Sequence, residues 1–412
     1  MEAETALEHP ETRRVSAQHP PVRGIKRVIF SLIPVLLLCG AGEGAARIIY
    51  WRQHGHDWRY LTIPFGWKDK SPYGLKNLTV YPSVHKTKTL FDQLSQRELV
   101  FRVNSQGGRG GEWVQAKAPG TTRILAIGGS STFGINNPEE ATWPVLLKRE
   151  LKSASGTDVE VLNGGRPGGM LGSQPGGADA LDSQDLLKSL QGSNSWFQMR
   201  PDVVLYYEGY NNSPRPYLRR VDWAIARFHT AMWLGQWSRW LYYRSMLYTY
   251  LVEKWFFTWI RKQYPLSSAV TYYRAEVQEL FHDIQAHGAK PVLVLQVLPY
   301  PDPAEIRQAN LHDPQAVDAL VNRLVDQHAG GQDVPIQEDF RSVYNAAVLI
   351  EVARREADAA GVQVIDPRPV FFSNGRLLEG LLHDHIHLTD RGNALLAQQI
   401  AAQLRLSSAT QP

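Results

Sequence analysis

Short apolar segments recur between residues 122 and 366 of the chain, each followed by turn residues such as Gly, Asn or Pro. They are rich in Val, Ile and Leu, and they lie at 123–127, 159–162, 202–207, 290–297 and 362–365. Stretches with the period of a helix separate them, at about 142–153, 177–191, 268–287 and 336–360. Apolar strands that alternate with helices are typical of a parallel sheet covered on both faces. The pattern therefore predicts an α/β domain over residues 119–407.

An uncharged apolar run at residues 28–42 suggests a membrane segment. Its 15 residues are fewer than the ~20 that span a bilayer. Basic side chains on both sides of the run, including Arg47, can reach the interfaces and make up the difference, and Trp51 fits the aromatic belt on the far side. We therefore predict a transmembrane signal-anchor over 25–51, after a disordered tail at 1–24.

The basic residues before the run predict that the tail is cytoplasmic and that the rest of the chain lies outside. In a bacterium this means a single-pass protein of the inner membrane with a periplasmic main domain. A cleaved signal peptide is an alternative, because residues 41–45 are mostly small, and a buried helix is another. A lipoprotein fits less well, since Leu38 precedes Cys39 where a small residue is expected.

Two segments fall outside the alternating pattern. Residues 52–118 hold short apolar pieces between Pro, Gly and Asn. They are expected to form a stem with a few strands, such as one at 99–103. Residues 213–267 hold six of the 12 tryptophans with many Lys and Arg, which predicts an insert of two or three amphipathic helices. The sequence leaves three roles for the insert: a helical cap on the domain, a lid or acceptor groove over the site, or a contact with the membrane surface. A second long connection, 299–335, contains several Pro and Gly and is expected to border the site.

Composition excludes some function classes. The net charge of +4, from 44 basic and 40 acidic residues, is too small to indicate a nucleic-acid partner. Cys39 is the only cysteine, which excludes an intramolecular disulfide and a cysteine metal site. Nothing in the sequence indicates an oligomeric state.

Polar or glycine-rich turns follow the predicted strands. They lie at 128–134, 163–168, 209–212 and, near the C-terminus, 383–393. In open α/β sheets ligands bind beyond the carboxyl ends of the strands. We therefore expect these four turns to meet and form the functional site.

The order of the turns resembles that of the SGNH (GDSL-like) hydrolase family, whose blocks are Gly-Asp-Ser, an isolated Gly, Gly-x-Asn-Asp and Asp-x-x-His. The matching residues are Gly128-Gly129-Ser130, Gly165, Gly209-Tyr210-Asn211-Asn212 and Asp384-His385-Ile386-His387. The resemblance covers about residues 122–405. It rests on the four blocks occurring in the family's order rather than on any one block. It implies a flavodoxin-like three-layer sandwich with a five-stranded parallel sheet in the order 2-1-3-4-5.

The resemblance also assigns roles. Ser130 is the expected nucleophile, His387 the base and Asp384 the carboxylate that orients it. The expected oxyanion donors are the N–H groups of Ser130 and Gly165 and the side chain of Asn211. No metal and no cofactor are implied.

Two positions depart from the family pattern. Gly129 and Asn212 each stand where the family has Asp. In the family neither position is a nucleophile, a base or an oxyanion donor, so the expected catalytic set is complete. The sequence does not predict which groups form the hydrogen bonds around Ser130. Membrane-anchored members of the family look similar in their Gly-Gly-Ser-Ser turn and in the stretch matching 104–110 here.

The residue chemistry agrees with these roles, because a serine hydroxyl needs a base to become a nucleophile, and residues three apart share one side of a turn. Ser131 is the alternative nucleophile, and Gly165 and Asn211 have an alternative reading as ordinary turn residues. The alternating imidazoles of His383, His385 and His387 would suit zinc on a strand, but no further ligand cluster is evident and 389–393 indicates a helix start. His385 is expected at the rim of the site or in a solvated loop.

The sequence thus predicts a serine esterase or deacylase that cleaves acyl esters, with acetyl as the expected group, of an envelope glycan or polysaccharide through an acyl-serine. An O-acetyltransferase that uses the same triad is an alternative. A non-catalytic membrane-anchored envelope scaffold is a second alternative, which Gly129 and Asn212 motivate.

Overall fold

The structure is a computed structural model. It describes residues 23–53, 86–92, 95–155, 158–171, 186–191, 195–213, 245–251, 266–300, 303–329 and 334–405. The chain divides into two compact units, Met1–Leu61 and Thr62–Pro412. The six tryptophans of the predicted insert and all but the last two residues of the predicted tail lie outside the described residues.

In the first unit, α1 (Arg23–Gln53) is a helix of 31 residues. Its window Leu32–Ile49 is long and apolar enough to cross a membrane, with a mean hydropathy of 1.7. Leu36, Leu37 and Leu38 are exposed on this helix. The predicted anchor at 25–51 is therefore helical, and a signal sequence near the N-terminus meets the same criteria.

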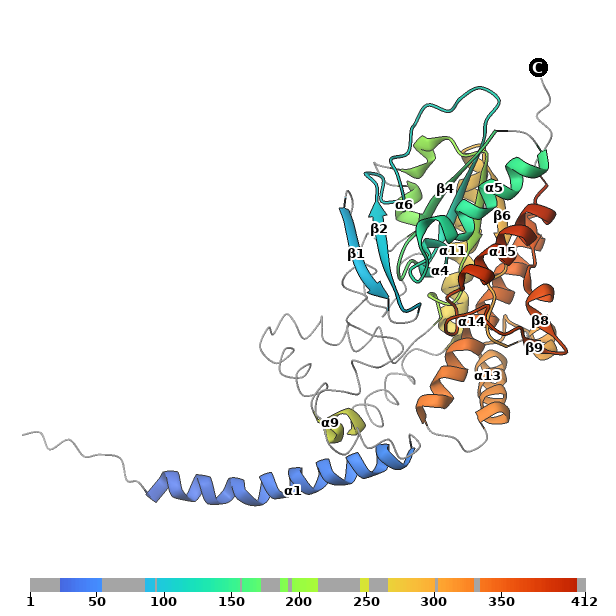
Figure 1. Ribbon diagram of the computed structural model, residues 1–412. Coiled ribbons are helices and arrows are strands. Elements are labelled where there is room, and N and C mark those ends of the chain that lie inside the picture. The colour runs from blue at the N-terminus through green and yellow to red at the C-terminus, as the bar shows by residue number, and fades with distance from the viewer. Residues whose placement is uncertain are drawn as a thin grey trace, which may run out of the picture. The chain divides into compact units, whose positions relative to one another are not determined.

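The second unit is built on a five-stranded parallel sheet (Figure 1). Its strands are β3 (Thr122–Gly128), β4 (Val159–Gly165), β5 (Val203–Tyr207), β6 (Lys290–Val294) and β7 (Gln363–Ile365). They pair in the order β4-β3-β5-β6-β7. In chain order this is 2-1-3-4-5, so the predicted fold is confirmed.

Helices cover both faces of this sheet. Ile124 and Ala126 of β3 belong to one buried cluster, whereas Leu125 and Ile127 belong to the other, because alternate residues of a strand face opposite sides. The first cluster includes side chains of α5 (Trp143–Ser155) and α15 (Asp390–Gln403). The second includes those of α6 (Leu186–Gln191), α11 (Leu266–Ala286), α13 (Pro314–Ala329) and α14 (Val334–Ala359).

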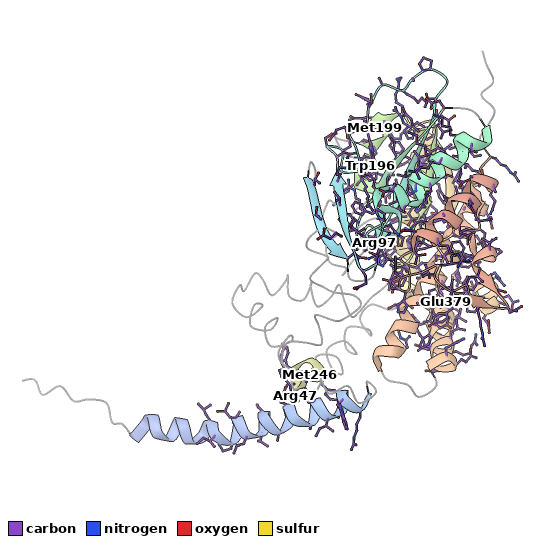
Figure 2. All side chains as sticks on the ribbon, in the orientation of Figure 1. Arg47, Arg97, Trp196, Met199, Met246 and Glu379 are labelled. Atoms are coloured by element: carbon purple, nitrogen blue, oxygen red, sulfur yellow. The ribbon has the colours of Figure 1, made fainter. Side chains whose placement is uncertain are left out.

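The larger cluster also contains η2 (Trp196–Met199), whose Trp196 and Met199 are labelled in Figure 2. The remaining short elements are α4 (Ser130–Phe133), η1 (Glu139–Ala141), α9 (Met246–Leu251), η5 (Arg368–Phe371), β8 (Phe372–Ser373) and β9 (Arg376–Leu377).

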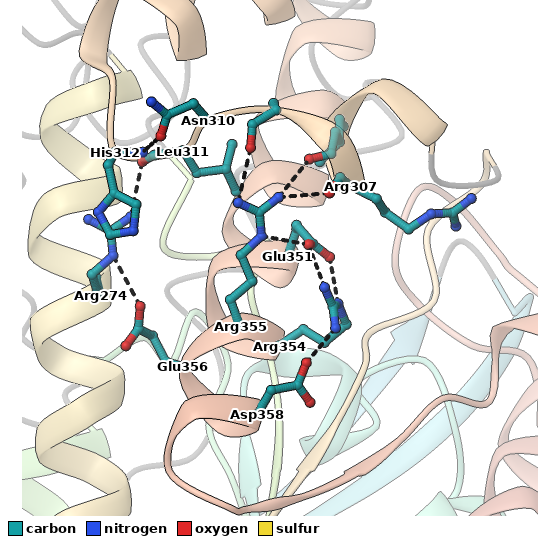
Figure 3. Close-up of polar contacts among 12 residues, drawn as sticks. Arg274, Arg307, Asn310, Leu311, His312, Glu351, Arg354, Arg355, Glu356 and Asp358 are labelled. Atoms are coloured by element: carbon teal, nitrogen blue, oxygen red, sulfur yellow. Dashed lines mark hydrogen bonds and ion pairs between the residues drawn. The ribbon is translucent and has the colours of Figure 1, made fainter.

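The connection at 299–335 is more regular than its Pro and Gly content suggests, because it contains α12 (Ala304–Gln308) and α13. Val317, Leu320 and Leu324 of α13 are buried at helical spacing. α12 is held to α14 by Arg355, which donates to the carbonyls of Ile306, Arg307 and Ala309 and pairs with Glu351 at 2.8 Å (Figure 3).

Part of the predicted stem packs on the sheet unit. β1 (Lys86–Asp92) and β2 (Arg97–Val103) form an antiparallel hairpin, so the strand expected at 99–103 is confirmed. Leu99, Phe101 and Val103 of β2 share a buried cluster with Phe133 of α4. This hairpin therefore lies against the segment that carries Ser130.

Candidate active site

Ser130 stands at the carboxyl end of β3, where the chain turns into α4. Gly128 ends the strand, Gly129 precedes the helix, and Gly134 closes it in the left-handed region with φ of 79°. That conformation is easy only for glycine, so the turn is tight on both sides of the serine. Ser130 is 6% exposed, and its N–H has no acceptor among the residues that the structure describes.

Asp384 and His387 lie on one loop before α15. The Asp384 Oδ1 atom accepts the N–H groups of Ile386 and His387, both at 2.8 Å. The His383 N–H donates to the His387 carbonyl at 2.7 Å, and the Thr389 N–H donates to the Leu381 carbonyl at 3.0 Å. These bonds fold residues 381–389 into a closed loop in which the carboxylate organises the backbone that carries the imidazole.

The loop brings the imidazole to the serine. The His387 Nε2 atom is 2.8 Å from the Ser130 Oγ atom, and the His387 Nδ1 atom is 2.6 Å from the Asp384 Oδ2 atom. An ionised carboxylate can only accept a hydrogen bond, so Nδ1 carries the proton and Nε2 is left to accept one from the hydroxyl. The three expected triad residues thus form one continuous hydrogen-bonded chain.

The Asp384 carboxyl is held in its ionised form. Burial alone would raise its pKa, but the charge and hydrogen bond of His387 and the N–H groups of Ile386 and His387 outweigh that effect and hold the pKa well below its usual range. A carboxylate whose pKa lies this far below the usual range is charged at neutral pH. It can therefore stabilise a positive charge on the adjacent imidazole.

Ser131 has a different partner from Ser130. Its buried Oγ atom donates to the Ile386 carbonyl at 2.8 Å. The bond joins the start of α4 to the loop of His387, across 255 positions of sequence. The hydroxyl of Ser131 is therefore used to join the two segments, whereas the hydroxyl of Ser130 meets the imidazole.

A second tie joins the hairpin to α15. Arg97 pairs with both carboxylate oxygens of Asp390, at 2.8 and 3.0 Å, and Asn137 donates to the same carboxylate at 2.9 Å. Thr389 caps this helix by accepting the N–H of Gly392, so the helix start expected at 389–393 is confirmed.

Gly165 lies beside α4 rather than in open space. Its N–H donates to the Asn163 Oδ1 atom at 2.9 Å. A methyl group at this position would overlap the backbone of Thr132 and Phe133. Glycine is therefore required here by the chain's own close approach, and the N–H must leave Asn163 before it can bind an oxyanion.

The Asn211 side chain also has partners within the protein. Its Nδ2 atom donates to the Gly169 carbonyl at 2.9 Å and to the Glu208 Oε2 atom at 3.1 Å. Asn212, one of the two departures, exchanges two bonds with the backbone of Leu171, at 2.8 and 3.1 Å. Asn212 thus joins the end of β5 to the loop after β4.

Sequence reasoning missed Arg109, which is 3% exposed and fixes the far end of α4. Its guanidinium donates to the carbonyls of Phe133, Gly134 and Asn137 and lies over the rings of Phe101 and Phe133, at 4.9 and 5.0 Å. The only signal for it was the Asn-Ser-x-Gly-x-Arg-Gly stretch, in which Arg109 is the one charged residue.

His383 and His385 lie on the same loop as His387. Among the described residues, no group of three His, Cys, Asp or Glu side chains is arranged to hold a metal ion. Burial lowers the pKa of His383 against the opposing effects of Asp92 and Asp384, which favours the neutral ring. His385 is half-buried in the same loop.

Comparison with known proteins points to one family. The model of the GDSL-like lipase/acylhydrolase family matches residues 124–400, more than half of the chain. No curated protein sequence matches the chain.

Several solved structures are similar in part. A lipase/acylhydrolase from Enterococcus faecalis is 16% identical, covers 70% of this chain and 100% of its own, and gives a TM-score of 0.37. The acetyl xylan esterase AlAXEase is 16% identical, with coverages of 68% and 98% and a TM-score of 0.36. A variant of an acetyl xylan esterase from Geobacillus stearothermophilus is 12% identical, with coverages of 70% and 96% and a TM-score of 0.35.

Proposed function

Because the chain belongs to the GDSL-like lipase/acylhydrolase family and is a hydrolase of ester bonds, we propose that Ser130, His387 and Asp384 are its catalytic triad. The observation that carries the proposal is the unbroken chain of hydrogen bonds from the Ser130 hydroxyl through His387 to Asp384, at 2.8 and 2.6 Å. These are the distances at which a base can take the proton of a nucleophile.

The proposed reaction has two halves. The Ser130 Oγ atom attacks the ester carbonyl while the His387 Nε2 atom takes its proton, and the same proton then passes to the departing alcohol oxygen. A water molecule next attacks the acyl-serine while His387 takes a proton of that water. The same proton then passes to the departing Ser130 Oγ atom, which releases the acid and restores the serine hydroxyl. In both halves Asp384 stabilises the imidazolium and keeps its orientation.

The developing oxyanion requires donors aimed at it. The Ser130 N–H is the donor with no acceptor of its own among the described residues. We propose that the Asn211 amide joins it by exchanging the Gly169 carbonyl for the substrate oxygen. Gly165 would contribute only if its N–H left Asn163.

Replacement of Ser130 tests the proposed triad. The variant Ser130→Ala should lose the burst of chromophore from an aryl acetate and should lower kcat on the order of 10⁴–10⁶-fold. Ser153→Ala, which changes an exposed serine of α5, should keep both. An unchanged rate in Ser130→Ala would exclude Ser130 as the nucleophile, and with it the proposed triad.

We propose an acylated glycan or polysaccharide of the cell envelope as the substrate, with acetyl as the acyl group. The proposed location of the enzyme favours this substrate, because α1 is long and apolar enough to span a membrane and basic residues precede it. The proposed layout is a cytoplasmic tail at 1–24, an anchor at 25–51, a stem at 52–118 and a periplasmic hydrolase domain at 119–407 with an insert at 213–267.

Two measurements test the substrate and the location. Acetate should be released from acetylated envelope polysaccharide, and transfer of the acetyl group to an added glycan would instead indicate the acetyltransferase alternative. Protease added to spheroplasts should digest the hydrolase domain. Digestion only after lysis would overturn the periplasmic orientation.

A further inference from the structure

We propose that Glu208 is a positioning residue for ester cleavage, because its buried carboxylate occupies the space beside Gly129 and fixes the Asn211 amide next to the nucleophile turn. The inference rests on the proposed triad and on the proposed role of Asn211 as an oxyanion donor. Glu208 follows β5 directly and is 2% exposed.

The space beside Gly129 is already filled by a carboxylate. A methyl group on Gly129 would overlap both the Glu208 Oε2 atom and the Asn211 Nδ2 atom. The φ of Gly129 is −84°, outside the left-handed region that favours glycine. Space is therefore a reason for glycine at 129, and the Glu208 carboxylate and the Asn211 amide are the groups that take it.

The same carboxylate organises the turn after β5. Its Oε1 atom accepts the N–H groups of Gly209 and Asn211, at 3.0 and 2.8 Å, and its Oε2 atom accepts the Asn211 amide at 3.1 Å. Both the backbone and the side chain of Asn211 are thus held by one rigid group. In the Gly-Asp-Ser block the carboxylate belongs to the residue before the serine, whereas here it comes from a neighbouring strand.

The two bonds of the Asn211 amide differ in strength. The bond to Glu208 has a charged acceptor, whereas the bond to Gly169 joins two neutral groups, and charge-assisted hydrogen bonds are roughly twice as strong. When an oxyanion competes for the amide, the Gly169 carbonyl is the partner that is exchanged. Glu208 then keeps the amide in place during the reaction.

A double-mutant cycle tests this by moving the carboxylate from one strand to the other. Glu208→Ala leaves the Asn211 amide without its charged partner and should lower kcat about 10–100-fold, short of the loss expected for removing an oxyanion donor outright. Gly129→Asp places a second carboxylate in occupied space and should also lower activity. The double variant Gly129→Asp/Glu208→Ala should recover at least about 10-fold over Glu208→Ala, because it restores one carboxylate to the vacated space.

Each rate is expressed per active serine, titrated with a serine-reactive phosphonate, and KM is measured beside kcat. A residue that only supports folding would lower the fraction of active serine and the Tm, and would leave kcat per active serine unchanged. We expect the opposite: a lower kcat per active serine with KM changed less than about 3-fold. A double variant that is as slow as Glu208→Ala, or slower, would overturn the proposal.

Glu208→Gln tests the same inference if the Glu208→Ala variant does not fold. It keeps the volume of Glu208 but turns an NH₂ group towards the Asn211 amide, so kcat per active serine should again fall. Glu305→Gln, which changes an exposed glutamate of α12, is the matched control. A normal kcat in Glu208→Gln would overturn the inference about Glu208. The triad is tested separately, by the burst of the wild type and its loss in Ser130→Ala.

Discussion

The two sides of Ser130 are built in different ways. On one side, His387 and Asp384 come from a single loop, and the carboxylate bonds the backbone of the loop that it stands on. On the other side, Gly129, Gly165 and the Asn211–Glu208 pair come from three strand ends. Each side has a carboxylate that bonds the backbone of its own turn, but only on the amide side does close packing between segments also exclude any side chain at Gly129 and Gly165.

This difference determines how substitutions on each side should affect activity and stability. A change on the histidine side removes a charge or a proton acceptor and leaves the neighbouring backbone in place. A side chain added at Gly165 on the amide side overlaps the backbone of α4, and so moves Ser130 with it. On the first side the loss of activity should come with a loss of stability that depends on pH, whereas added volume on the second side should lower activity and packing stability together.

The largest effect is expected on the histidine side, from Asp384→Asn. The amide keeps an oxygen for the N–H groups of Ile386 and His387 but presents an NH₂ group to Nδ1, which favours the wrong tautomer. We expect kcat to fall about 10⁴-fold. Asp326→Asn, which changes an exposed aspartate of α13, should leave kcat unchanged.

The same variant gives a stability test through pH. The folded protein holds the pKa of Asp384 below its unfolded value, so the carboxylate contributes stability that is full above about pH 4 and is lost as the pH falls further. The Tm of the wild type should exceed that of Asp384→Asn at neutral pH, and the gap should narrow below about pH 4. A gap that widens in acid would contradict the assignment.

A smaller but combined effect is expected on the amide side, from Gly165→Ala. The added methyl group overlaps the backbone of Thr132 and Phe133, and overpacking of this kind costs about 1–3 kcal/mol of unfolding free energy. Activity should fall together with stability, because the turn that carries Ser130 must shift. Gly111→Ala, where nothing lies within 4 Å of the new group, is the control, and equal behaviour of the two variants would refute the packing argument.

The smallest effect is expected where the two sides are tied together, from Ser131→Ala. The change removes the bond to the Ile386 carbonyl and should cost about 1 kcal/mol of stability, with a fall in kcat of roughly 10-fold or less because Ser130 and His387 are held less closely. Labelling of Ser130 by a phosphonate, read by mass spectrometry, should persist. A complete loss of labelling would make Ser131 the nucleophile instead.

The contrast also explains what the sequence could predict. The parallel sheet followed from five apolar strands, and its order followed from the resemblance to the SGNH family. That resemblance, together with a spacing of three residues in one loop, also predicted the pairing of Asp384 with His387. Glu208 could not be found in this way, because its role depends on which side chain meets the space beside Gly129. The helix α13 was missed because Pro and Gly at the ends of its segment obscured the buried positions Val317, Leu320 and Leu324.

The position of Arg109 bears on how the protein can be shortened. A version cut at residue 119, where the alternating pattern begins, would lack this guanidinium and the Phe101 ring beneath it. It would also lose the hydrogen bonds that Arg109 donates to the carbonyls of Phe133 and Asn137. A version that starts at Thr62, the boundary of the second compact unit, keeps them. The hairpin should therefore be kept with the sheet domain, and a truncation that removes α1 should stop well before it.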